Sequence, residues 1–97
     1  MSSSAFIVTF ADTYENVSRE HVVAVFTDEK EADRFCVAAQ KEADRVIEAR
    51  RKRYSRWQPG DPLPKNPRPT FDIGLWDDLT ESIYYQVEEV TLNPTFP

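Results

Sequence analysis

The chain has 97 residues, 40% of them hydrophobic and 12% aromatic, with a formal net charge of −5. This length suffices for one hydrophobic core but not two, and the composition is that of a folded rather than a disordered chain. No apolar run reaches the roughly 18 residues of a membrane span, and the excess of acids disfavours nonspecific binding of the whole molecule to nucleic acid or anionic lipid.

Two short apolar runs near the N-terminus predict an antiparallel hairpin. Residues 5–10 and 21–26 are rich in strand-forming residues, and the polar residues 12–18 between them suit a long turn. Strict alternation directs one set of side chains toward a covering helix: Phe6, Val8, Phe10, Val22, Ala24 and Phe26. The opposite face then carries Ile7, Val23 and Val25.

Residues 28–54 predict one long helix. Asp28 and Glu31 have the spacing of a capping box, with Thr27 as the alternative cap. Apolar residues follow with the 3.6-residue period of a helix: Ala32, Phe35, Cys36, Ala39, Ala43, Val46 and Ile47. This stripe predicts that the helix packs across one face of the sheet.

The rest of the chain predicts a loop and a closing strand. Residues 58–70 hold five of the seven prolines, which exclude a continuous helix or central strand and favour an extended loop. Residues 71–76 suit a short edge strand, and residues 83–92 suit a longer one with a β-bulge at Glu88–Glu89, where the apolar phase changes. We therefore expect an α+β fold in β-β-α-β order: a three- or four-stranded antiparallel sheet with one long helix on one face, as a single domain over residues 1–97.

The reactive residues form no catalytic pattern. His21 is the sole histidine, Cys36 is the sole cysteine and falls on the apolar helix stripe, and two glycines cannot build a phosphate-binding loop. We therefore expect a non-enzymatic protein without cofactor or metal. A metal-dependent hydrolytic enzyme stays open as a third interpretation, with a divalent ion held by carboxylates from Asp72, Asp77, Asp78 and Glu81.

Charge is distributed unevenly along the chain. Residues 45–68 hold eight of the twelve basic residues and two acids, a net +6, so the remainder carries −11. A helix over residues 28–54 is about 40 Å long, whereas a strand of six to eight residues spans about 20–27 Å, so the helix end should extend beyond the sheet. We expect this end to bind a partner through Arg50, Arg51, Lys52, Arg53, Tyr54, Arg56 and Trp57. A protein partner is the first interpretation, and a nucleic acid is the alternative.

The strand and helix sequences resemble those of a class of small bacterial and phage proteins. The resemblance lies in Phe-Ile-Val-Thr-Phe at 6–10, Val-Phe-Thr at 25–27, Asp-Glu-Lys-Glu-Ala-Asp-Arg-Phe at 28–35 and Tyr-Tyr-Gln-Val-Glu-Glu-Val-Thr-Leu at 84–92. It implies a protein-binding regulator or inhibitor of the host-defence-inhibitor, anti-CRISPR-like kind. Residues 1–6 lack the basic start and long apolar stretch of a signal peptide, so we expect a cytoplasmic protein, in the bacterial host cytoplasm if a phage encodes it.

One helix can cover only one face of the sheet. Ile7, Val23 and Val25 would then form an apolar patch on the other face, and such patches are unusual on monomers. A homodimer through this face is our first expectation, since twofold contacts are the commonest oligomer symmetry. The alternative is that residues 71–76 fold over the patch.

Overall fold

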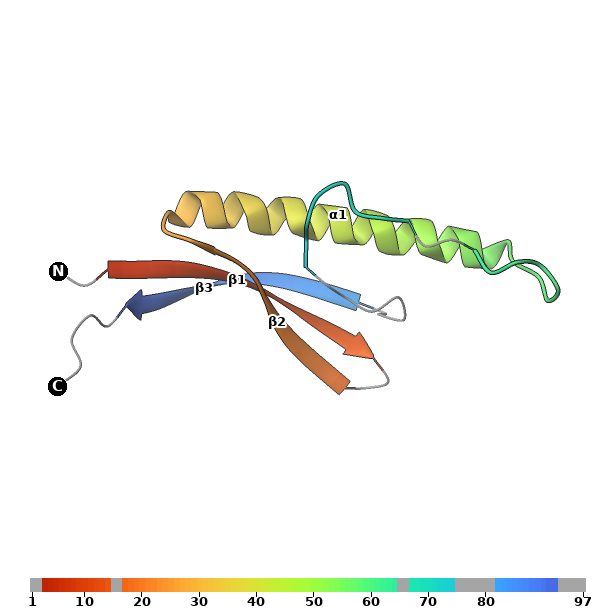
Figure 1. Ribbon diagram of the computed structural model, residues 1–97, viewed down its shortest axis with the longest axis horizontal. Coiled ribbons are helices and arrows are strands. Elements are labelled where there is room, and N and C mark those ends of the chain that lie inside the picture. The colour runs from red at the N-terminus through yellow and green to blue at the C-terminus, as the bar shows by residue number, and fades with distance from the viewer. Residues whose placement is uncertain (1–2, 15–16, 65–66, 75–81, 93–97) are drawn as a thin grey trace.

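The computed structural model describes residues 3–14, 17–64, 67–74 and 82–92. Its elements are β1 (Ser3–Tyr14), β2 (Val17–Phe26), α1 (Glu29–Ser55) and β3 (Ser82–Leu92). The strands form one antiparallel sheet in the order β2-β1-β3, and α1 lies across one face of it (Figure 1). The predicted α+β fold in β-β-α-β order is confirmed. We call the face toward α1 the inner face and the opposite one the outer face.

The hairpin of β1 and β2 is longer than its apolar runs. Backbone pairing continues from Asp12 opposite Arg19 to Tyr14 opposite Val17. The predicted long turn over residues 12–18 is therefore wrong in all of its described part. Backbone hydrogen bonds extend a strand ladder whatever the hydropathy of the side chains, so a hydrophobic pattern underestimates strand length. Residues 15–16 lie outside the described residues.

A register shift decides which residues of β2 face the helix. Val8 lies opposite Ala24 while Thr9 lies opposite Val22, so Val23 is an extra residue in β2. Val23 packs against the core, whereas Val22 is 65% exposed. The prediction that Val23 lies on the outer face and Val22 on the inner face is therefore wrong. A β-bulge reverses the alternation of side chains beyond it, and strict period-two reasoning does not foresee that.

Strand β3 pairs with β1 without interruption, from Leu92 opposite Ser3 to Ser82 opposite Thr13. The bulge predicted at Glu88–Glu89 is therefore wrong, and Val90 and Leu92 keep the phase of the outer face. On the other edge of β3, the side chain of Gln40 in α1 donates from Nε2 to the carbonyl of Ile83 and accepts at Oε1 from the N–H of Tyr85, both at 2.9 Å. One amide thus ties the helix to the strand and occupies two backbone groups of its edge.

Helix α1 begins and ends within one residue of its predicted limits. The Asp28 carboxylate accepts a hydrogen bond from the N–H of Lys30 at 2.9 Å, which satisfies one of the unpaired donors of the first turn. The buried side chains of the helix are Ala32, Ala39, Ala43 and Val46. In the part of the chain that the structure describes, no helix is long and apolar enough to cross a membrane.

Residues 71–74 lie on the inner face, between α1 and the sheet. Ile73 is fully buried in the core, and its carbonyl accepts a hydrogen bond from the Tyr85 hydroxyl at 2.6 Å. The ring of Phe71 meets that of Phe35 edge-on, with centroids 6.1 Å apart. These residues form no strand and do not fold over the outer face, so both expectations are wrong for residues 71–74. Residues 75–76 lie outside the described residues.

The two glycines allow a test of this packing. Both have positive φ, +98° at Gly60 and +101° at Gly74, but a Cβ at Gly60 would meet nothing within 4 Å, whereas one at Gly74 would lie 2.5 Å from the buried Phe10 ring. We expect Gly60→Ala to cost about 1–3 kcal/mol of unfolding free energy through backbone strain alone. Gly74→Ala should cost about 1–3 kcal/mol more, because the Phe10 ring has no room to move. Urea denaturation of both variants measures the difference, and equal costs would contradict the position of residues 71–74.

Candidate binding surface at the basic end of the helix

The C-terminal part of α1 extends beyond the sheet (Figure 1). The last buried residue of the helix is Val46, nine residues before its end at Ser55. Ile47 also packs against the core, so at 1.5 Å per residue about 12 Å of helix follows the last core contact. The predicted reason for this overhang, a helix longer than the strands, is wrong, because the 12 residues of β1 span about 40 Å, as do the 27 residues of α1. The hairpin ends of β1 and β2 instead diverge from the helix (Figure 1).

The predicted binding residues all lie on this overhang or just after it. We call this set the basic end: Arg50, Arg51, Lys52, Arg53, Tyr54, Arg56 and Trp57. Arg51, Lys52, Arg53 and Arg56 are exposed, and Arg50 is half-buried. Successive helical residues are about 100° apart around the axis, so the four consecutive cations 50–53 surround the helix rather than line one side. The structure therefore brings the predicted residues together as a convex, positively charged tip.

The cationic side chains are not what ends the helix. The carbonyl of Lys52 accepts from the Ser55 hydroxyl at 2.7 Å. The carbonyls of Arg53 and Tyr54 accept from the backbone N–H groups of the residues three positions later, Arg56 and Trp57. These bonds satisfy carbonyls that a helix end otherwise leaves unpaired. The Arg51 guanidinium pairs with Glu48 at 3.1 Å, and both side chains are more than half exposed. Such a surface pair contributes about 0–1 kcal/mol, so it does little for folding.

The two aromatic residues of the basic end have different surroundings. Tyr54 is 45% exposed. Trp57 is half-buried, and its indole N–H donates to the carbonyl of Asp61 at 3.1 Å. The Asp61 carboxylate also accepts from the N–H of Gln58 at 3.1 Å, so Trp57 belongs to a turn that redirects the chain. Tyr54 is thus the aromatic side chain of the basic end that is open to a partner.

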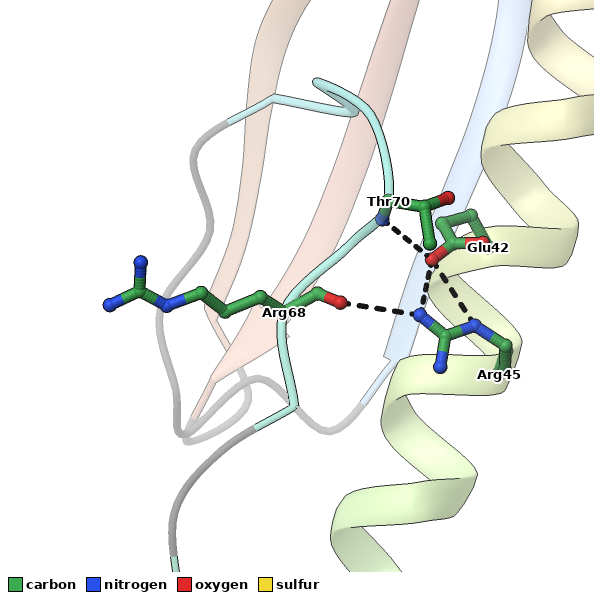
Figure 2. Close-up of polar contacts among 4 residues, drawn as sticks. All are labelled: Glu42, Arg45, Arg68 and Thr70. Atoms are coloured by element: carbon green, nitrogen blue, oxygen red, sulfur yellow. Dashed lines mark hydrogen bonds and ion pairs between the residues drawn. The ribbon is translucent and has the colours of Figure 1, made fainter.

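A polar cluster that local sequence patterns do not reveal holds the returning chain against α1 (Figure 2). The Glu42 carboxylate accepts from the Arg45 guanidinium and from the N–H of Thr70, the latter at 3.0 Å. Arg45 also donates to the carbonyl of Arg68 at 3.2 Å. We call Glu42, Arg45, Arg68 and Thr70 the clasp. Hydrogen bonds from Arg45 and then from the Thr70 backbone hold the pKa of Glu42 below its ordinary value.

The clasp shows what sequence reasoning missed. The only local signal was the spacing of Glu42 and Arg45, three residues apart on one helix, which is typical of a solvated ion pair. Their partners are backbone groups of the proline-rich segment, more than twenty residues later in the chain. The segment predicted as a loop over residues 58–70 is therefore fixed to the helix at Arg68 and Thr70.

The other reactive residues have structural surroundings. His21 stacks on the ring of Phe10, with centroids 4.7 Å apart. Cys36 packs against the core, where burial, with a smaller effect of Asp33, raises the pKa of its thiol. The described residues contain no cluster of three potential metal ligands. The Asp72 carboxylate accepts from the N–H of Gly74 at 2.9 Å, while the other carboxylates of the metal interpretation, at positions 77, 78 and 81, lie outside the described residues.

Comparisons with known proteins leave this surface without a precedent. No known protein family, curated protein or solved structure matches the chain. The functional argument therefore depends on the residues of this chain alone.

The clasp should open when Glu42 is neutralised. Because the folded pKa of Glu42 lies below its ordinary 4.5, its stabilising contribution is complete above that value and is lost as the pH falls through the folded pKa. We expect Glu42→Gln to speed hydrogen exchange of the Thr70 amide at neutral pH. The matched control is Glu48→Gln, which removes another glutamate three residues before an arginine that does not reach the returning segment. Similar exchange of Thr70 in both variants would show that the clasp does not hold the segment.

Proposed function

We propose that this chain is a non-enzymatic protein-binding regulator or inhibitor, and that its basic end occupies an acidic, concave surface of a partner protein. The observation that carries the proposal is that exposed cations surround a helix tip beyond the last core contact. Termination of the helix does not require this cluster, since backbone groups and the Ser55 hydroxyl already satisfy carbonyls of the helix end.

The chemistry of the basic end suits a protein surface. Arginine and tyrosine are enriched among the residues that carry most of the binding energy at protein interfaces. Here Tyr54 directly follows the four cations 50–53, three of which are arginines, and guanidinium groups bind carboxylates in bidentate geometry. A convex cationic tip is complementary in shape and charge to an acidic cavity or groove, and its occupation would block whatever else binds there. A bacterial defence complex is the partner class that we propose to test first.

A protein partner explains the surface better than a nucleic acid does. The rest of the chain carries −11, which repels phosphates as the molecule approaches them. Binding to single strands usually combines cations with several stacking aromatics, but Trp57 is half-buried and its indole N–H is already bonded. Nucleic-acid binding remains the alternative that the experiment below separates.

Removing cations from the basic end should abolish partner capture without unfolding the chain. The test variant carries Arg51→Gln, Lys52→Gln and Arg56→Gln together, all at exposed positions. The control carries Lys30→Gln, Arg34→Gln and Lys41→Gln, an equal change of charge at exposed positions nearer the start of the same helix. We expect thermal unfolding to change little in either variant, since surface substitutions usually stay within about 0.5 kcal/mol.

Capture from bacterial lysate, read by mass spectrometry, gives the functional result. Proteins held by the native chain and the control but lost by the test variant support the proposal. Equal capture by both variants would contradict it. Capture that disappears on nuclease treatment, and that weakens steeply with salt, would instead assign the basic end to nucleic acid.

A further inference from the structure

The outer face of the sheet presents three aligned rows of side chains. The printed register places one residue from each strand in each row, in the order β2, β1, β3: Val25, Ile7 and Glu88, then Val22, Thr9 and Gln86, then Glu20, Ala11 and Tyr84. Val22, Val25 and Tyr84 are 65, 61 and 67% exposed. Exposed apolar side chains therefore surround the central Thr9, and the acids of these rows, Glu20 and Glu88, lie on the outer strands.

Of the described segments, neither α1 nor residues 71–74 cover these side chains. Helix α1 lies on the inner face, and Ile73 carries residues 71–74 into the core on the same side. An apolar patch of this kind on a small protein marks an interaction site. A partner on this face must contact Val22, Val25 and Tyr84. It must also accommodate Glu20 and Glu88, which lie at two opposite corners of the three rows.

Strand addition at the edge of the sheet is a poorer explanation on the β3 side. There the Gln40 amide occupies the carbonyl of Ile83 and the N–H of Tyr85, the groups that a new strand would need. On the β2 side, the extra residue Val23 breaks the regular ladder that such pairing requires. The outer face, rather than either edge of the sheet, is therefore the surface that is open to a partner.

The outer face is complementary to a second copy of itself. A twofold axis along β1 places β2 of one copy over β3 of the other, so Glu20 meets Tyr84 and Glu88 meets Val25. A twofold axis across the strands through the middle row instead places Glu88 over Tyr84 and Glu20 over Val25. Because the two acids occupy different strands and different rows, neither arrangement places acid against acid. Each also gives an acid a tyrosine hydroxyl as a hydrogen-bond donor.

We propose that two copies of this chain pair through their outer faces, forming a sandwich of two sheets with the helices outside. Val22 replaces Val23 in the expected interface, beside Ile7 and Val25, because the bulge turns Val23 into the core. Three strands about 4.8 Å apart and about 30 Å long give a projected area of about 400 Å² per copy. Standard interfaces bury about 800 Å² per partner, so we expect a small, weak interface that forms at high protein concentration and dissociates on dilution. The contact leaves the basic end free and does not depend on the proposed function.

Sedimentation equilibrium of the whole chain tests the proposal. We expect the mass to rise with concentration from 11.3 kDa toward twice that value. Val22→Asp should keep the chain monomeric, while the matched control Val37→Asp, at a 56% exposed position of α1, should leave association unchanged. Both sites are exposed, so circular dichroism should show folded variants. A mass that stays at 11.3 kDa at all concentrations, or a dimer that survives Val22→Asp, would overturn the proposal.

Charge pairing between variants adds a test that misfolding cannot imitate. If the twofold axis crosses the strands, Val22 faces Val22, so mixing Val22→Asp with Val22→Lys should restore association. If the axis follows β1, Val22 faces Gln86, so mixing Val22→Asp with Gln86→Lys should restore it instead. Recovery in either mixture supports pairing of the outer faces and identifies the axis. Recovery in neither would show that these faces do not meet.

Discussion

Burial of the alanine stripe of α1 against the inner face is the interaction on which the rest of the structure depends. Ala32, Ala39 and Ala43 are completely buried. Their small side chains let the helix backbone approach the sheet closely, and larger residues fill the space beside them, with Phe10 and Tyr85 coming from the strands. Gln40, on the same helix, fixes the position of α1 along β3 through two backbone hydrogen bonds.

The helix extends beyond the part of the sheet that it covers, and two features follow from this overhang (Figure 1). The last eight residues of α1 follow its last core contact, at Ile47, and this exposes the basic end. The chain must then return along the helix before β3 can complete the sheet, and the clasp fixes this return path at Arg68 and Thr70 (Figure 2). Proline suits such a path because it needs few backbone hydrogen bonds of its own.

Covering the sheet with one helix also separates two surfaces of different chemistry. The outer face exposes Val22, Val25 and Tyr84 and carries acids, whereas the basic end is polar and cationic and lies on a different element. Contacts at one surface therefore do not compete with contacts at the other. A dimer through the outer faces would carry two basic ends, so a partner with two acidic sites could be bound with higher avidity.

Local physics made the helix and the existence of the strands predictable from the sequence. The helix pattern repeats every 3.6 residues and Asp28 supplies a cap, so both limits of α1 depend on residues within a few positions of them. The position of the cationic residues at the helix end was readable for the same reason. Their exposure depends in addition on the divergence of the hairpin ends of β1 and β2 from the helix, which element lengths do not indicate (Figure 1).

Tertiary structure decided what depends on pairing between distant segments. The bulge at Val23 arises from the register between β1 and β2, which no residue of β2 specifies alone, and it determines which valine faces outward. The burial of Ile73 and the contacts of Glu42 with the returning chain join residues that are far apart in sequence. The sequence by itself thus determined the elements and the place of the charges, because these follow from local periodicity. Only the fold decided which faces remain open, because that depends on where a long return segment packs.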